Sequence, residues 1–192
     1  MKILIIDNHT EHLLELTNCF TNSPEIVNKE AFDNGFNVEN FDLIILSGSF
    51  NMPTVLRHPD FYQQEIDLIK NSKIPIIGIC LGAELIIKAF AGKLEELSHN
   101  LDGEVKLNIL DNDLKAIFNK NPIKVIEHHK IGVKELPKDL IELANSPDCI
   151  EIFKHISRPI LGIQFHPEIG QHKEIFNWAI KKLLKHSNNK NL

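Results

Sequence analysis

Short apolar runs and helically spaced apolar residues alternate along the first half of the chain. The runs predict strands at residues 2–7, 25–29, 41–46 and 75–79. Between them, apolar residues at helical spacing predict helices over residues 11–22 and 59–71, and a third that contains residues 85–89. Such alternation is typical of a parallel sheet wrapped by helices. Ligands of these sheets bind at the carboxyl ends of the strands.

The pattern changes from Gly92 onward, where shorter apolar segments follow one another with a single weak helical turn near residues 114–118. These segments predict strands at residues 93–97, 104–110, 123–128, 141–145, 150–155 and 159–165. A last amphipathic helix is predicted over residues 173–185. The second half is therefore expected to add a small antiparallel extension to the sheet. Because no linker or composition shift interrupts the chain, we expect a single domain over residues 1–192.

Composition and charge exclude several classes of function. Hydrophobic residues make up 43% and charged residues 24% of the chain, and the formal net charge is -5, so we expect no nucleic-acid partner. No apolar segment approaches the roughly 20 residues that span a bilayer, so we expect no membrane segment. The three cysteines, Cys19, Cys80 and Cys149, are widely spaced and odd in number, which favours a reducing compartment. We therefore expect a cytoplasmic protein.

Cys80 lies where an apolar strand passes into a helix, and Gly78 and Gly82 bracket it. The two glycines permit a sharp turn and a close approach of substrate. A helix N-terminus favours a thiolate over a thiol, which activates the sulfur. This combination predicts a nucleophile elbow. Cys19 and Cys149 lack such a setting and are expected to be structural.

A second chemical motif follows the strand at residues 159–165, where His166-Pro167-Glu168 ends it. Two residues apart, His166 and Glu168 are expected to project to the same side. A carboxylate on one imidazole nitrogen would orient the other nitrogen toward Cys80. The backbone amides of Leu81 and of the Gly48–Ser49 loop are candidates for an oxyanion hole.

These motifs together resemble the class I (triad) glutamine amidotransferases. The resemblance is carried by residues 78–82 (Gly-Ile-Cys-Leu-Gly), by residues 162–168 (Gly-Ile-Gln-Phe-His-Pro-Glu) and by the Ser47-Gly48 loop. It covers nearly the whole chain in order and spacing. Within the family, it is closest to the amidotransferase subunit of archaeal-type GMP synthase.

The resemblance implies a flavodoxin-like, three-layer α/β fold with a mostly parallel central sheet and a small antiparallel extension. It implies that Cys80 attacks the side-chain amide of glutamine, that His166 acts as the acid and base, and that Glu168 orients His166. Ammonia would pass to a synthetase subunit in trans, such as that of GMP synthase. No cofactor is implied.

Several positions differ from the family pattern. Glu84 stands where the family usually has a substrate-binding glutamine, and Ser49 and Phe50 replace Gly-Pro in the oxyanion loop. His129 matches the family's histidine, but Ile131 replaces its acid. Glu84 and His129 are therefore the candidate substrate-binding residues. An ionised Glu84, one turn after Cys80, would oppose the thiolate unless it were protonated or paired.

These departures leave two alternatives open. One is a stand-alone enzyme that hydrolyses a γ-glutamyl amide, with Glu84 recognising an amine; the other is a non-catalytic regulatory or binding subunit. We expect no metal site, although the chain has ten histidines. Adjacent residues on a strand point to opposite faces, so His128 and His129 make a poor chelate.

Overall fold

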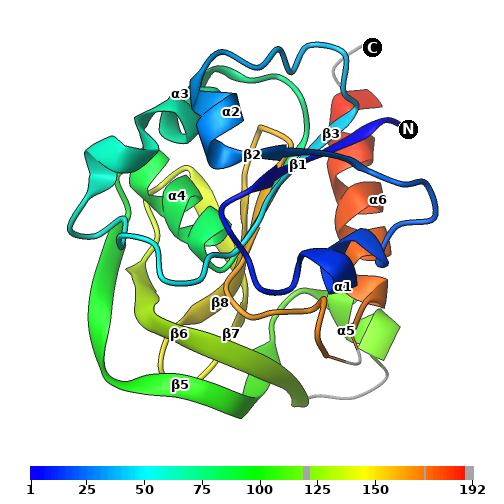
Figure 1. Ribbon diagram of the computed structural model, residues 1–192. Helices are drawn as coiled ribbons and strands as arrows, with labels where there is room; N and C mark the ends of the chain where they lie inside the picture. Colours follow the sequence, from blue (N-terminus) through cyan, green and yellow to red (C-terminus); the bar gives the residue numbers. More distant parts are fainter. Residues whose placement is uncertain (119–121, 171, 189–192) are drawn as a thin grey trace.

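The computed structural model describes residues 1–118, 122–170 and 172–188, shown in Figure 1. Its strands are β1 (Ile3–Asp7), β2 (Glu25–Asn28), β3 (Leu43–Leu46), β4 (Ile76–Ile79), β5 (Lys93–Ile109), β6 (Ile123–Glu135), β7 (Leu140–Asn145), β8 (Ile150–His155) and β9 (Ile160–Ile163). Its helices are α1 (Leu13–Thr17), α2 (Lys29–Asp33), the short 3-10 helix η1 (Pro59–Tyr62), α3 (Gln63–Asn71), α4 (Leu81–Ala89), α5 (Asn112–Phe118) and α6 (Glu174–Asn188).

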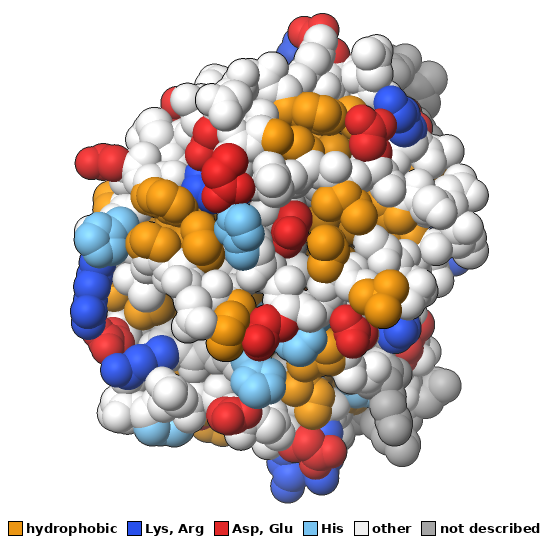
Figure 2. All heavy atoms as spheres, in the orientation of Figure 1, with side chains coloured by type: hydrophobic (Ala, Val, Ile, Leu, Met, Phe, Trp, Pro, Cys, Tyr) orange, Lys and Arg blue, Asp and Glu red, His pale blue; other side chains and the backbone are white. Residues whose placement is uncertain are grey.

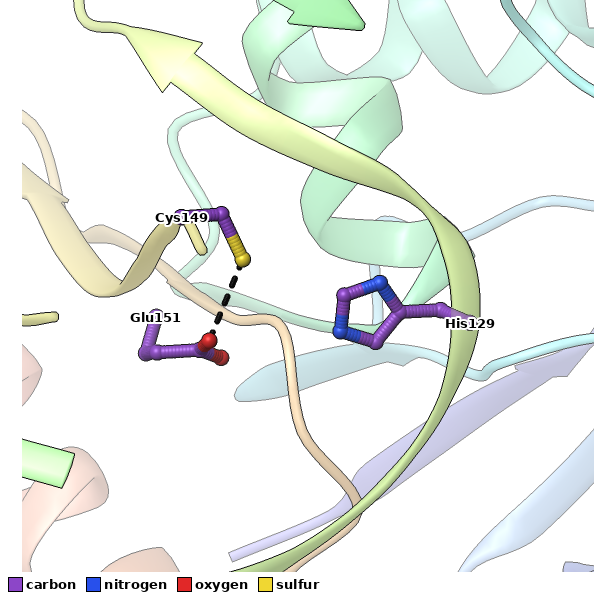
Figure 3. A group of neighbouring side chains, drawn as sticks. All are labelled: His129, Cys149 and Glu151. Atoms are coloured by element: carbon purple, nitrogen blue, oxygen red, sulfur yellow. Dashed lines mark hydrogen bonds between the residues drawn. The ribbon is translucent and has the colours of Figure 1, made fainter. Parts of the chain in front are cut away.

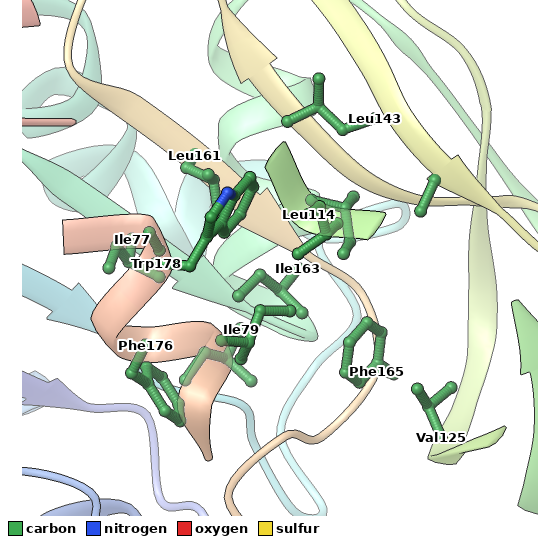
Figure 4. Packing of buried hydrophobic residues seen from close by; sticks show 14 of the residues in the cluster. Ile77, Ile79, Leu114, Val125, Leu143, Leu161, Ile163, Phe165, Phe176 and Trp178 are labelled. Carbon is green, nitrogen blue, oxygen red and sulfur yellow. The ribbon is translucent and has the colours of Figure 1, made fainter. Parts of the chain in front are cut away.

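Five of these strands form a parallel array in the order β2-β1-β3-β4-β9. The strands β3, β4 and β9 are buried along their whole length, which explains why their sequences are continuously apolar. Alternate side chains enter two separate cores, one on each face. In the first, Phe176 and Trp178 of α6 pack with Ile77 and Ile79 of β4 (Figure 4). Helices α3 and α4 cover the opposite face.

The expected flavodoxin-like fold, with a mostly parallel sheet and a small antiparallel extension, is wrong, although the chain is α/β. The described residues form one mixed sheet of nine strands. Four of its strand pairings are parallel and five are antiparallel. The antiparallel strands β5, β6, β8 and β7 pair in a closed ring, because β7 also returns to β5. The second half is thus a four-stranded barrel joined to the parallel strands through β8 and β9.

The barrel was missed because its closure depends on pairings between distant segments, which local periodicity does not record. Strand β5 is a single element of 17 residues, where the sequence predicted two strands at 93–97 and 104–110. A register shift between Glu96 and Leu101 allows this long strand to bend while it stays paired with β6. Gly103, with φ +108°, takes a conformation that other residues rarely adopt.

Two smaller predictions also changed. The helix expected over residues 11–22 is only the five residues of α1. Helix α2 was not predicted at all; Asn28 caps its N-terminus by accepting a hydrogen bond from the Ala31 N–H at 2.9 Å. None of the helices in the described ranges is long and apolar enough to cross a membrane.

Candidate active site

Cys80 is the single residue between β4 and α4, and its backbone makes the turn. Its φ of 49° and ψ of -105° place a non-glycine residue in a conformation that is rarely populated. Two hydrogen bonds hold it there: the Cys80 N–H donates to the Ile163 carbonyl at 2.8 Å, and the Glu84 N–H donates to the Cys80 carbonyl at 3.0 Å. The thiol is thereby fixed at the carboxyl end of β4, beside β9.

Gly78 and Gly82, which were expected to permit a sharp turn and a close approach of substrate, have a different structural role. A Cβ on Gly78 would lie 2.3 Å from the Gly82 carbonyl oxygen, and a Cβ on Gly82 would lie 2.4 Å from the Leu46 carbonyl oxygen. Both glycines therefore allow the first turn of α4 to pack directly on β3 and β4. The sharp turn itself is made by Cys80, which has the positive φ.

His166 and Glu168 lie together beside Cys80, as their spacing predicts. His166 Nδ1 and Glu168 Oε1 are 2.7 Å apart, and both side chains are buried. The His166 backbone N–H donates to the Ile126 carbonyl at 3.0 Å, which ties this segment to β6. The imidazole also interacts directly with the Cys80 thiol. Cys80, His166 and Glu168 thus form one continuous chain of side chains.

The electrostatic environment of these three side chains favours proton exchange between the Cys80 sulfur and the His166 imidazole. Burial raises the pKa of the Cys80 thiol above its usual value, and the interaction with His166 offsets only part of this rise. Burial lowers the pKa of His166, but the contacts with Cys80 and Glu168 outweigh it, so that the His166 pKa lies well above its usual value. The imidazole can therefore hold the thiol proton as an imidazolium next to a thiolate.

The three predicted oxyanion residues border the same site. A Cβ on Gly48 would lie 2.9 Å from His166 Cε1 and 3.5 Å from Cys80 Cβ, so the Gly48 backbone lies against both side chains. Ser49 and Leu81 line a pocket of about 130 Å³ that also contains Cys80. The absence of a side chain at Gly48 is therefore required by its two neighbours.

Glu84 lines this small pocket and is almost fully buried, with 5% of its surface exposed. Burial raises its pKa to about 8, although a hydrogen bond from Gln164 opposes the shift. Gln164 Nε2 donates to Glu84 Oε1 at 3.5 Å, and the Gln164 N–H donates to the Glu151 carbonyl at 2.8 Å. A pKa of about 8 keeps Glu84 predominantly in the neutral carboxylic acid form at pH 7.

Sequence reasoning missed Gln164 as the partner of Glu84. The signal that could have found it is its position two residues before His166, which places both side chains on the same side of an extended segment.

His129 also borders the pocket, but both of its ring nitrogens face other protein groups. Its Nδ1 donates to the Ile131 carbonyl at 2.8 Å, and its Nε2 contacts the Glu127 carboxyl group. Burial lowers the pKa of His129, which keeps the ring neutral. The expected substrate-binding histidine is therefore part of the pocket wall, with its polar atoms bound within the protein.

A larger hollow of about 540 Å³ adjoins this site, and Ser49, His129 and His166 line it. Two histidines that the sequence did not assign to the site also line it. The His12 and His128 rings have their centroids 5.6 Å and 6.4 Å from that of His166. The face drawn in Figure 2 shows histidine side chains lying among acidic ones. The sequence signal was only that the chain is rich in histidine.

Comparisons with known proteins agree on one family. The family model for glutamine amidotransferase class-I matches residues 4–182. The chain is 34% identical over 179 residues to a GMP synthase (glutamine-hydrolyzing) subunit of Methanothermobacter thermautotrophicus, covering 90% of this chain and 91% of that protein. It is 42% identical over 105 residues to the corresponding subunit of Methanobrevibacter smithii, covering 54% of this chain and 55% of that protein. A crystal structure of a putative GMP synthase subunit from Thermoplasma acidophilum matches with a TM-score of 0.83 and 25% identity, covering 100% of this chain and 98% of that one.

Proposed function

The chain belongs to the class-I glutamine amidotransferase family, and on this premise we propose that Cys80, His166 and Glu168 are the catalytic triad that releases ammonia from glutamine. The observation that carries the proposal is the buried contact between His166 Nδ1 and Glu168 Oε1, which are 2.7 Å apart. This contact lies on the side of the imidazole away from Cys80, whose backbone is strained. A cysteine nucleophile needs such an oriented imidazole beside it.

The reaction follows from the positions of these groups. In the proposed reaction the Cys80 thiolate attacks the side-chain carbonyl carbon of glutamine, and the backbone amides of Ser49 and Leu81 stabilise the oxyanion. The imidazolium of His166 protonates the departing nitrogen, the C–N bond breaks, and ammonia leaves a glutamyl thioester on Cys80. Water then attacks the thioester while His166 takes its proton. Glutamate is released and the thiolate is restored.

The protonation state of Glu84 supports glutamine as the substrate. A neutral carboxyl group offers one O–H donor and one carbonyl acceptor, which resembles the donor and acceptor of the glutamine side chain that the family usually has here. A neutral Glu84 also adds no negative charge beside the Cys80 thiolate. The stand-alone γ-glutamyl amide hydrolase needs an ionised Glu84 to recognise an amine, which its raised pKa disfavours. The assembled triad likewise disfavours a non-catalytic regulatory subunit.

We further propose that a synthetase subunit in trans receives the ammonia. The support is the similarity to proteins named as glutamine-hydrolyzing GMP synthase subunits, one of which aligns over nine-tenths of this chain. The alignment to another such relative spans about half of that relative's length. The acceptor chemistry is therefore assigned to a partner of the GMP synthase type.

The test measures glutamate release and thiol labelling. The purified chain, alone and with the synthetase subunit of a GMP synthase, is assayed for glutamate formation from glutamine. It is also treated with a glutamine-analogue electrophile, and the modified cysteine is identified by mass spectrometry. We expect labelling of Cys80, loss of both signals in Cys80→Ala, and retention of both in Cys19→Ala. Glutamate release that persists in Cys80→Ala, or no release with or without the partner, would refute the proposal.

A further inference from the structure

A second group of reactive side chains lies in the barrel wall, outside the proposed triad. Glu127 and His129 occupy alternate positions on β6, whereas Cys149 immediately precedes β8 and Glu151 is the second residue of that strand. Because alternate residues of a strand share a face, Glu127 and His129 point to the same side of β6. The neighbouring alternate positions on β6 are buried and apolar: Ile123, Val125, Ile131 and Val133. Glu127 and His129 therefore interrupt a row that otherwise belongs to the core.

The four side chains are in contact. The Cys149 thiol donates to Glu151 Oε1 at 3.1 Å, and His129 Nε2 meets Glu127 Oε2. Glu127 and Glu151 also lie close enough for their charges to repel each other when both are ionised. One potential ligand atom from each of His129, Cys149 and Glu151 lies within 4.8 Å of the other two. Figure 3 shows the His129 ring directed toward the pair formed by Cys149 and Glu151.

The hydrogen bonds within the protein leave part of this group unsatisfied. Glu127 and Glu151 have no exposed surface, and one oxygen of each, Glu127 Oε1 and Glu151 Oε2, has no hydrogen-bond partner among the described residues. Buried carboxylates in proteins are usually paired with a cation or coordinate a metal. No lysine or arginine side chain forms an ion pair with either group in the described part of the chain.

We propose that His129, Cys149 and Glu151, with Glu127 as the fourth ligand, bind a divalent transition-metal ion of the zinc class. One imidazole nitrogen, one thiolate and carboxylate oxygens form a donor set that suits tetrahedral zinc. The imidazole tautomer is already set, because Nδ1 donates to the Ile131 carbonyl; Nε2, which contacts the Glu127 carboxyl group without the ion, is the nitrogen that would bind it. The ion replaces the Cys149 thiol proton and the carboxyl protons of this group, which pass to solvent. No electron is transferred.

Strand pairing explains why the sequence led us to expect no metal. His128 and His129 are adjacent on β6, and adjacent strand residues point apart. The ligands that share a face with His129 are instead Glu127 on its own strand and the Cys149–Glu151 pair about twenty residues further along the chain. The pairing of β6 with β8, through Val133 and Ile150, brings these two pairs of residues together.

The proposed ion is structural and lies directly behind the active site. All four ligands are buried, so the site has no open coordination position for a substrate. The carbonyl of Ile126, next to Glu127, holds the His166 backbone, and the carbonyl of Glu151 holds the Gln164 backbone. An ion that cross-links β6 and β8 therefore fixes the two strands from which His166 and Gln164 are positioned.

The test uses cobalt as a spectroscopic substitute for zinc in the full chain, after treatment with a chelator. We expect one Co²⁺ per chain, with a thiolate-to-cobalt charge-transfer absorption that Zn²⁺ abolishes by displacing the cobalt. The absorption should be lost in Cys149→Ser and retained in Cys80→Ser, which removes the other buried thiol near a histidine. Circular dichroism establishes that each variant is folded.

A second measurement does not depend on the thiol. Zn²⁺ should raise the Tm of the wild-type chain, and its affinity should fall more than about tenfold in Glu151→Gln, which keeps the shape of the side chain. No charge-transfer absorption in the wild type, or an absorption that disappears with Cys80 and survives in Cys149→Ser, would overturn the proposal. Failure here leaves the proposed glutaminase reaction intact, because none of the four ligands belongs to the triad.

Discussion

Replacing Glu84 by glutamine tests whether burial keeps this side chain neutral. Glutamine has nearly the same shape and can still accept the hydrogen bond from Gln164, but it does not titrate. The carboxyl group of Glu84 has a pKa of about 8 in the folded chain, against a usual value of 4.5. The variant therefore removes one titration and leaves the surrounding packing largely unchanged.

The size of the effect follows from the two pKa values. Well below pH 4.5, Glu84 is protonated in both the folded and the unfolded chain, so pH has no effect on stability through this group. As the pH rises from there to 8, only the unfolded chain loses the proton, and the folded state is progressively destabilised. At 1.36 kcal/mol per pKa unit, this group alone lowers the free energy of unfolding by about 3.5 kcal/mol between pH 5 and pH 8. Above pH 8 the loss levels off.

Urea unfolding of the wild type and Glu84→Gln at pH 5 and pH 8 measures this difference. We expect the variant to gain about 3.5 kcal/mol relative to the wild type on going from pH 5 to pH 8. Glu65, Glu127 and Glu151, whose pKa values are also raised by burial, are present in both proteins and cancel in the comparison. The control is Glu30→Gln, at an exposed carboxyl whose pKa is lowered by His9, which should give no such gain. An equal stability difference at both pH values would refute a neutral Glu84.

Two further substitutions test the site and the fold. Gly48→Ala places a Cβ 2.9 Å from His166 Cε1, so the imidazole must shift. We expect kcat for glutamine to fall about 100-fold with little change in the free energy of unfolding. Unchanged kinetics would contradict the close approach of Gly48 to His166. Lys29→Met leaves the fully buried Glu65 without the ammonium group 3.5 Å away, and should lower the free energy of unfolding in urea by about 3–5 kcal/mol. The control, Lys2→Met at an exposed ion pair, should lower it by less than about 1 kcal/mol.

The proposed triad was accessible from the sequence because each of its parts is local. A strand, a turn and a helix around Cys80 follow from neighbouring residues, and the spacing of His166 and Glu168 places them on one side of an extended segment. Cys80 and the His166–Glu168 pair come together because the carboxyl ends of neighbouring parallel strands lie at the same edge of the sheet. The pairing of β4 with β9 provides that edge.

The features that the sequence did not predict depend on pairings between distant strands. The bond between Gln164 and Glu84 joins residues 80 positions apart, and the closure of the barrel joins β5 to β7 through two residue pairs. Neither contact changes the local periodicity of its segment. The neutral state of Glu84 was likewise invisible, because it depends on the depth at which tertiary packing buries the carboxyl group.

The backbone conformation of Cys80 means that activity and stability oppose each other at this position. A non-glycine residue held at φ 49° and ψ -105° costs of order 1–3 kcal/mol, which the surrounding fold must offset. Glycine adopts such angles without strain but has no sulfur. The most relaxed chain at this turn is therefore an inert one, and the working protein remains less stable than its own fold allows.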